Sequence, residues 1–246
     1  MINVANKVAI VTGAGSGVGK AIAVLHGVNG AKVVVSDVNR RKGIKTVEEI
    51  KSKGGEAIFI KADTSIPEDQ KSLVENTLKH FGALHIACNN SSIKESKESL
   101  GEYPNEGWQD IIISNLEGAY YGMHYQIPAL LASGGGSIVN IASVLGKIGN
   151  KSLPAYVANK THVAALELAN QKIRVNAIGP GYINTPLNRG AEGTDSFYDL
   201  AGLHPIGHLS TPEEVAELTL WLSSPVANFV SGFYYIINGE YSESFI

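Results

Sequence analysis

Short runs of β-branched and other apolar residues alternate along the chain with stretches in which apolar residues recur every three or four positions. The first run, Lys7 to Thr12, is followed by a glycine cluster and then by apolar residues at Val18, Ala21, Ile22 and Leu25, which is the spacing of one helix face. This alternation of strand and helix continues to the end of the chain. Predicted strands cover Lys7 to Thr12, Val33 to Ser36, Ala57 to Ile60, Leu84 to Cys88, Ser137 to Ala142, Arg174 to Ile178 and Phe233 to Ile237.

The segments between these strands have helical spacing. It predicts helices through Ile44 to Ile50, Leu73 to Phe81, Trp108 to Leu131, Pro154 to Asn170 and Pro212 to Ser223. Capping boxes are expected where Ser65 precedes Glu68 and where Thr211 precedes Glu214. Without a linker-like segment or a repeat, this order indicates an α/β protein with one seven-stranded parallel sheet covered by helices on both faces. Right-handed crossovers make it a doubly wound, Rossmann-type fold in a single domain, residues 1–246.

The segment from Pro186 to Leu209 has no clear period and is rich in glycine, asparagine and aspartate. Ligands of doubly wound sheets bind beyond the carboxyl ends of the strands, so this segment is a candidate substrate lid, residues 186–209. Its apolar residues Leu187, Phe197, Tyr198 and Leu203 favour a partly apolar substrate, or else they anchor the segment to the core.

Composition excludes several classes of protein. Of the 246 residues, 44% are hydrophobic, which is typical of a globular protein and not of a disordered chain. The formal net charge is -3 and the charges are interspersed, so no basic stripe suited to nucleic acid is expected. No apolar stretch is long enough to span a bilayer and the first residues do not resemble a signal peptide, so we expect a cytoplasmic protein.

Metal and disulfide chemistry is also disfavoured. The single cysteine, Cys88, excludes an internal disulfide and a thiolate metal cluster, and its apolar neighbours predict that it is buried. His204 and His208 are four residues apart but flank Pro205 and Gly207, which disfavour a continuous helix between them. The seven histidines show no ligand spacing, and we expect no metal.

A glycine-rich segment, Thr12 to Gly19, joins the first strand to the first helix. Such a loop is often structural, but between a strand and a helix it favours a dinucleotide, whose pyrophosphate binds at the helix N-terminus. Asp37 ends the second strand, where a carboxylate accepts hydrogen bonds from the adenosine ribose and repels a 2′-phosphate. NAD is therefore favoured over NADP. Alternatively Asp37 only caps a turn, and the nearby Arg40 and Arg41 keep NADP possible.

Tyr156 and Lys160 are four residues apart on one predicted helix and therefore share a face. Carbonyl reduction needs a proton donor, and a nearby ammonium lowers the pKa of a phenol toward the working range. Alone, this pair is more often found on a helix surface. Ser143 ends the preceding strand, where its hydroxyl can hold a substrate oxygen or cap a helix. Asn115 is a poor helix former inside a long helix, so its amide serves another purpose, either in the site or as a solvated or bridging group.

The order of these features along the chain resembles that of the short-chain dehydrogenase/reductase family, and the match covers nearly the whole chain. The features are the glycine segment, Asp37, Asp63, Asn89-Asn90, Asn115, Ser143, Tyr156, Lys160 and Pro180-Gly181. The resemblance implies a role for each catalytic position. Tyr156 would be the general acid/base, and Lys160 would lower its pKa and bind the nicotinamide ribose. Ser143 would bind the substrate oxygen, and Asn115 would anchor a proton-relay water.

The resemblance also implies a cofactor site and a homotetramer. Asp63 would contact the adenine, Asn90 would lie beside the adenosine ribose, and the segment from Pro180 to Thr185 would touch the nicotinamide end. The implied cofactor-binding residues are Gly13, Ser16, Gly17, Val18, Gly19, Asp37, Asp63, Thr64, Asn90, Tyr156, Lys160, Pro180, Gly181, Ile183 and Thr185.

The chain departs from the family pattern in two places. The family's Asn-Asn-Ala-Gly reads Asn89-Asn90-Ser91-Ser92 here, and we expect Ser92 to strain that loop because it replaces glycine. After Lys160 about six residues are missing, equivalent to about 9 Å of helix. This shortening predicts a helix that ends early and a stretched connection into the strand at Arg174.

The pattern as a whole predicts an NAD(P)-dependent oxidoreductase that interconverts a secondary alcohol and a ketone. The alternative is a non-catalytic dinucleotide-binding or scaffold protein, with the shortened helix and the Ser91-Ser92 loop as its basis. Sugars, steroids, acyl thioesters and simple alcohols all remain possible substrates, because the fold hosts many of them.

Overall fold

The computed structural model of the chain describes residues 2–93, 104–144, 161–185 and 201–241. Its centre is a seven-stranded sheet in the order β3-β2-β1-β4-β5-β6-β7, and every neighbouring pair is parallel. The predicted doubly wound sheet is thus confirmed. Its strands are β1 Val8–Val11, β2 Lys32–Ser36, β3 Glu56–Ile60, β4 Ile86–Asn89, β5 Gly136–Ile141, β6 Ile173–Pro180 and β7 Tyr234–Ile237.

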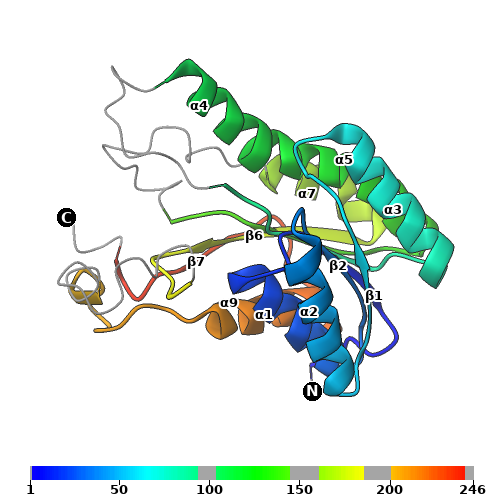
Figure 1. Ribbon diagram of the computed structural model, residues 1–246, viewed down its shortest axis with the longest axis horizontal. Helices are drawn as coiled ribbons and strands as arrows, with labels where there is room; N and C mark the ends of the chain where they lie inside the picture. The colour runs from blue at the N-terminus through cyan, green and yellow to red at the C-terminus, as the bar shows by residue number, and fades with distance from the viewer. Residues whose placement is uncertain (1, 94–103, 145–160, 186–200, 242–246) are drawn as a thin grey trace.

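Helices cover both faces of this sheet (Figure 1). One layer holds α1 Gly17–Val28, α2 Arg40–Ser52 and α9 Pro212–Ser223. The other holds α3 Pro67–Phe81, α4 Asn105–Ile111, α5 Gly118–Ala132 and α7 Thr161–Leu168. None of the helices in the described ranges is long and apolar enough to cross a membrane.

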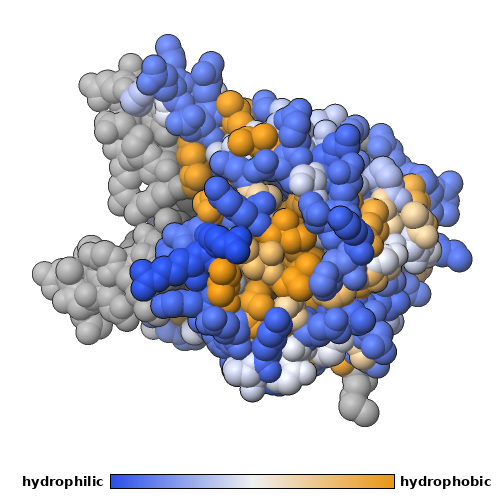
Figure 2. Space-filling model, turned by 45° about the vertical axis from the view of Figure 1, so that its right-hand side comes forward, coloured by the Kyte–Doolittle hydropathy of each residue, from blue (hydrophilic) through white to orange (hydrophobic). Residues whose placement is uncertain are grey.

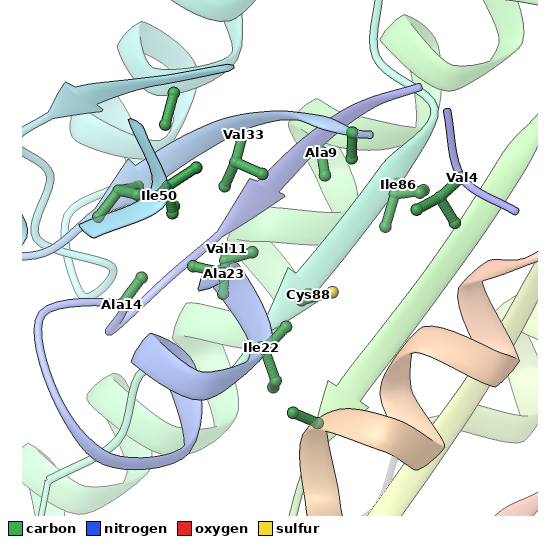
Figure 3. Packing of buried hydrophobic residues seen from close by; sticks show 14 of the residues in the cluster. Val4, Ala9, Val11, Ala14, Ile22, Ala23, Val33, Ile50, Ile86 and Cys88 are labelled. Carbon is green, nitrogen blue, oxygen red and sulfur yellow. The ribbon is translucent and has the colours of Figure 1, made fainter. Parts of the chain in front are cut away.

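The strands are buried on both faces, as parallel strands between two helical layers must be. Ala9 and Val11 of β1 pack with Ile22 of α1, whereas Ile10, between them, packs on the opposite face with Leu73 of α3. Figure 3 shows the first of these cores, to which α1 contributes Ile22 and Ala23 and β4 contributes Ile86 and Cys88. Because all neighbouring strands are parallel, the carboxyl ends of all seven strands lie at one edge of the sheet.

Strand β3 forms one edge of the sheet, and its last three residues are only partly buried. Figure 2 shows hydrophobic side chains gathered between hydrophilic ones on the face where β3 lies. The guanidinium of Arg40 lies over the ring of Phe59 in this strand, 5.9 Å from its centroid. Cations and long side chains at an edge strand oppose pairing with another chain.

One of the two expected capping boxes is confirmed. The Thr211 hydroxyl accepts the Glu214 backbone N–H at 3.3 Å, and the Glu214 carboxylate accepts the Thr211 N–H at 2.7 Å. The same carboxylate accepts further bonds from the hydroxyls of Thr211 and Ser210. The backbone bond from Thr211 is the largest cause of the lowered pKa of Glu214.

The capping box expected at Ser65 and Glu68 is wrong. Helix α3 begins after Ile66 with Pro67 in its first turn, and no side chain caps it. Ser65 instead donates from its hydroxyl and its backbone N–H to Asp63, at 2.6 and 3.0 Å. A carboxylate two residues before a serine competes for its donors, and Pro67 sets the helix start.

The stretched connection predicted before Arg174 is also wrong. Helix α7 runs to Leu168, a 3-10 turn continues over Ala169–Gln171, and Lys172, with a φ of 59°, turns the chain into β6. Leu168 is buried in the core, so packing holds this end of the helix against the sheet. The predicted start of that helix, residues 154–160, lies outside the described residues.

A buried histidine in α1 makes the stability of the fold depend on pH. His26 is fully buried; its Nδ1 contacts the Ile22 carbonyl at 2.9 Å, and its Nε2 has no partner within the described part of the chain. Burial lowers the pKa of His26 from 6.5 to about 4. The unfolded chain therefore binds this proton more readily, so the stability from neutral His26 is full above pH 6.5 and declines as the pH falls toward 4.

We predict that His26 contributes about 3 kcal/mol to the loss of unfolding free energy between pH 6.5 and pH 4. The His26→Leu variant should lose that part of the dependence, because leucine binds no proton. Urea unfolding at several pH values measures it, with His80→Leu at an exposed position as the control. An unchanged pH dependence in His26→Leu would contradict the prediction.

Candidate active site

The loop between β1 and α1 brings backbone atoms very close together. A Cβ at Gly19 would lie 2.4 Å from the Gly13 carbonyl oxygen, and Gly17 has a φ of 55°, which a side chain disfavours. A Cβ at Gly15 would lie 2.7 Å from Asp37 Oδ2. Side chains would therefore fill this turn, and glycines keep its backbone open to a ligand.

The N-terminus of α1 faces this loop and is not capped by a side chain. Ser16 is its N-cap but makes no side-chain cap bond, and the first turn contains no acidic residue. The first N–H groups of the helix, at Gly17, Val18 and Gly19, thus keep their capacity to bind an anion. A glycine turn with a free helix N-terminus fits the pyrophosphate of a dinucleotide.

Asp37 is held at the end of β2 by two backbone N–H groups. Its Oδ2 accepts from Gly15 at 2.8 Å, and its Oδ1 accepts from Asn39 at 2.8 Å. Asp37 therefore does cap a turn, as the alternative interpretation expected. Each of its carboxylate oxygens can still accept one more hydrogen bond, for example from a ligand. Asp37 presents a fixed negative charge beside the glycine loop.

The C-terminal ends of β1 and β4 are joined by Thr12, a contact that the sequence pattern did not single out. Its hydroxyl accepts the N–H groups of Asn90 and Ser91 at 3.0 and 3.1 Å. The Asn90 amide returns a bond to the Thr12 carbonyl at 3.0 Å. The only signal was a threonine directly after one strand and an asparagine directly after another. Asn90 is thereby fixed against the glycine loop, where it also approaches Gly13.

Ser92 was expected to strain the loop after β4, and that expectation is wrong. Within the described ranges, the non-glycine residues with positive φ are Asn6, Lys172 and Glu240. Ser92 is not among them. The loop avoids strain because neither Ser91 nor Ser92 adopts a positive φ, and the Ser91 N–H binds the Thr12 hydroxyl.

Beneath this loop, three buried amides connect β4, β5 and α5. Gln126 donates to Asn89 Oδ1 at 2.8 Å, and Asn89 donates to Asn140 Oδ1 at 3.0 Å and to Gln126 Oε1 at 3.2 Å. Each of the three is at most 9% exposed. Hydrogen-bonded polar groups in a core favour a single arrangement of the elements that carry them. Sequence reasoning missed Gln126 and Asn140, which stand as isolated polar residues in apolar segments.

Asn115 lies in a π-helical segment, Ile112–Glu117, between α4 and α5. Its Oδ1 accepts the Ile93 N–H at 2.9 Å and its Nδ2 donates to the Ile93 carbonyl at 3.2 Å. The side chain thus bridges the helix to the loop after β4, as the bridging alternative expected. Single π turns in long helices are frequent at functional sites.

Asp63 and Thr64 follow β3 at the same edge. Asp63 donates its N–H to Asp69 at 2.8 Å, which adds to its bonds from Ser65. A Cβ at Gly118 would lie 3.1 Å from the Thr64 carbonyl oxygen, so α5 begins close against this turn. Asp63, which the resemblance expects to contact an adenine, and Thr64 therefore lie at the rim formed by β3 and α5.

Ser143 and the segment after β6 lie at the other end of the edge. The Val144 N–H binds the Pro180 carbonyl at 2.9 Å, which places Ser143 beside Pro180 and Gly181. Ile183 and Thr185 are buried, and a Cβ at Gly17 would lie 3.5 Å from Thr185 Cγ2. This segment therefore reaches across to the glycine loop.

The structure gathers all the expected cofactor-binding positions that it describes along one edge of the sheet. Tyr156 and Lys160 fall in 145–160, outside the described residues, as does most of the candidate lid. Of the four expected catalytic residues, Asn115 and Ser143 are described, and the β4 and β5 ends bring them to the same edge.

Within the described part of the chain, neither the free thiol nor a metal site adds chemistry to this edge. Burial raises the pKa of the Cys88 thiol to about 12, so it stays protonated. Among the described residues, no three histidine, cysteine, aspartate or glutamate side chains gather to hold a metal ion. His204 instead stacks on Tyr241, with centroids 5.0 Å apart.

Comparison with known proteins agrees with this geometry. A family model described as Enoyl-(Acyl carrier protein) reductase matches residues 13–242. A cyclohexanol dehydrogenase from Acinetobacter sp. (strain SE19) is 47% identical over 243 residues, covering 96% of this chain and 95% of that protein. A 2,5-dichloro-2,5-cyclohexadiene-1,4-diol dehydrogenase from Sphingobium indicum (strain DSM 16412 / CCM 7286 / MTCC 6364 / B90A) is 39% identical over 241 residues, covering 94% and 95%.

A solved structure is similar over nearly the whole fold. It is a 7α-hydroxysteroid dehydrogenase complexed with NADH and 7-oxo glycochenodeoxycholic acid, with a TM-score of 0.91 and 29% identity, covering 97% of this chain and 95% of that one. The strand order of the sheet, the glycine turn and these relatives all indicate the same protein family. The chain belongs to the short-chain dehydrogenase/reductase family and is an oxidoreductase that interconverts a secondary alcohol and a ketone with a nicotinamide dinucleotide.

Proposed function

We propose that this enzyme oxidises an alicyclic secondary alcohol, a ring carbinol of the cyclohexanol class, to the ketone with NAD. The observation that carries the substrate class is the 47% identity to a cyclohexanol dehydrogenase over 96% of the chain. The second relative, named for a cyclohexadiene diol, also acts on a six-membered carbocycle by its name. The similar solved structure of a 7α-hydroxysteroid dehydrogenase contains NADH, which supports NAD as the cofactor of this enzyme.

Asp37 supports a preference for NAD over NADP. Its carboxylate is fixed by the N–H groups of Gly15 and Asn39, directly beside the glycine loop that fits a pyrophosphate. A fixed carboxylate accepts bonds from ribose hydroxyls and repels a phosphate at the 2′ position. Arg40 lies over the Phe59 ring, where an ion pair with a 2′-phosphate would compete with that contact.

The hydroxyl proton of the alcohol is assigned to the Tyr156 phenolate, which becomes the phenol, and the Lys160 ammonium favours the phenolate by lowering the pKa of that phenol. Both assignments rest on the family resemblance. When bound, the nicotinamide supplies the hydride acceptor. The Ser143 hydroxyl holds the substrate oxygen, and its place beside Pro180 and Gly181 supports that role.

Asn115 is proposed to position the elements around the site and not to contact the substrate with its side chain. Its amide is already bound to both backbone groups of Ile93, so it fixes the helix and the loop after β4 relative to each other. Any water relay at this residue would then use its backbone and not its amide. The π-helical segment around it supports a site role for that backbone.

We further propose that residues 1–246 form one catalytic domain with a lid at 186–209. By the family resemblance the protein assembles as a homotetramer, and the free, buried Cys88 fits a reducing cytoplasm. Size-exclusion chromatography with light scattering tests the assembly, and a mass near that of a monomer would contradict it.

Replacing Asp37 with alanine should lower kcat/KM for NAD about 10-fold to 100-fold, because hydrogen bonds to a charged group are lost. The ratio of NADP to NAD use should rise, since the repulsive charge is gone. Steady-state kinetics with both cofactors measures the ratio, and Asp110→Ala, at an exposed position in α4, is the matched control. A ratio equal to that of the wild type would show that Asp37 does not select the cofactor.

The alcohol assignment is tested by NAD reduction with cyclohexanol and, for comparison, the open-chain 2-hexanol. We expect faster turnover of the ring alcohol. Tyr156→Phe should reduce kcat by about 100-fold or more, since general acid/base catalysis contributes at least that factor, while NADH still binds. Tyr120→Phe, a half-exposed tyrosine, is the control. Binding of NADH without turnover of any alcohol would favour the scaffold alternative.

A further inference from the structure

A tyrosine from strand β7 reaches the backbone of Ser143. Tyr234 begins β7, which pairs with β6, whereas Ser143 follows β5 on the far side of β6. The Tyr234 hydroxyl nevertheless donates a hydrogen bond to the Ser143 carbonyl oxygen. One side chain thus spans the intervening strand and contacts the residue assigned to the substrate oxygen.

Gly179 in β6 makes this crossing possible. A Cβ at Gly179 would lie 2.3 Å from the Tyr234 hydroxyl oxygen and 2.6 Å from the carbon that bears it. Any other residue would displace the ring. A glycine inside a strand weakens the strand and often marks a place where another group approaches closely. The pair of Gly179 and Tyr234 therefore serves the contact to Ser143.

The contact fixes the chain at a point where the regular strand has ended. Strand β5 ends at Ile141, and beyond it the N–H groups of Ala142 and Val144 bind carbonyls of Ile178 and Pro180, at 2.7 and 2.9 Å. The carbonyl of Ser143 lies between these two bonds and receives the Tyr234 hydroxyl. Three successive residues are therefore held from the β6 and β7 side.

The Tyr234 hydroxyl remains a hydrogen-bond donor over a wide pH range. Burial raises the pKa of Tyr234 to about 12. The hydroxyl thus stays protonated at neutral and moderately alkaline pH and can donate to the carbonyl throughout.

We propose that Tyr234 is a positioning residue for alcohol oxidation, which holds Ser143 by its backbone so that the serine hydroxyl meets the substrate oxygen. This inference rests on the proposed role of Ser143. Tyr234 touches neither substrate nor cofactor in this account. It acts on the rate of the reaction through the geometry of Ser143.

The neighbouring Tyr235 provides a matched control. It points to the opposite face of β7, where its ring meets Trp221 edge-on at 6.0 Å and Phe233 at 4.9 Å. Tyr235→Phe and Tyr234→Phe remove the same atom from adjacent residues of one strand. Only the second change removes the bond to Ser143.

Kinetics with cyclohexanol and NAD gives the first test. Tyr234→Phe should lower kcat about 3-fold to 10-fold, the effect of one lost hydrogen bond, with an unchanged KM for NAD and an unchanged shape of the pH–rate profile. Tyr235→Phe should leave kcat unchanged. In a Ser143→Ala background the loss caused by Tyr234→Phe should disappear, because the two residues act as one unit. Equal kcat values for the two phenylalanine variants would overturn the proposal.

Hydrogen exchange gives a second test that needs no turnover. The amides of Ala142 and Val144 should exchange faster in Tyr234→Phe than in Tyr235→Phe, because the intervening carbonyl is released. Equal exchange would overturn the contact itself. If Ser143→Ala keeps full activity while exchange behaves as expected, the proposed role of Ser143 fails and the contact stands. If Ser143→Ala is inactive and Tyr234→Phe is fully active, the positioning role alone fails.

Discussion

The hydroxyl of Thr12 binds two strands that are neighbours in the sheet and 78 residues apart in the chain. It accepts the N–H groups of Asn90 and Ser91 just past the point where β1 and β4 end, and there the winding of the sheet reverses direction. Doubly wound sheets bind ligands at this reversal. The glycine turn starts one residue later, so its shape and the position of Asn90 both depend on this contact.

A second set of polar contacts fixes the long helix to the same place. Asn115 binds the backbone of Ile93, and Gln126 binds Asn89, so two points on one helix are tied to β4 and its loop. Apolar packing alone tolerates small shifts of a helix, whereas directional hydrogen bonds restrict them, above all the buried bond between Gln126 and Asn89. Acting from the other end of the edge, Tyr234 holds Ser143. The apolar layers thus build the fold, and polar contacts set the geometry of the edge.

The sheet, its helices and the glycine turn were predictable, because periodicity and motif spacing are local properties of the sequence. Contacts that depend on competition were less so. The capping box of Thr211 and Glu214 is present. The one expected at Ser65 and Glu68 is not, because the N–H and hydroxyl of Ser65 donate to Asp63. The helix does end early, at Leu168, but the connection after it was misjudged, because a 3-10 turn and the positive φ of Lys172 lead into β6 in place of a stretched segment. The bond from Tyr234 to Ser143 joins strands two places apart, and no local pattern signals it.

The most direct test of this account is a fluorescence titration of the full chain with NADH and, separately, with NADPH. The glycine turn, the free end of α1 and the fixed carboxylate of Asp37 predict saturable binding, with NADH bound more tightly. Tighter binding of NADPH would contradict the role of Asp37. No saturation with either cofactor would contradict the assignment of this edge as the dinucleotide site.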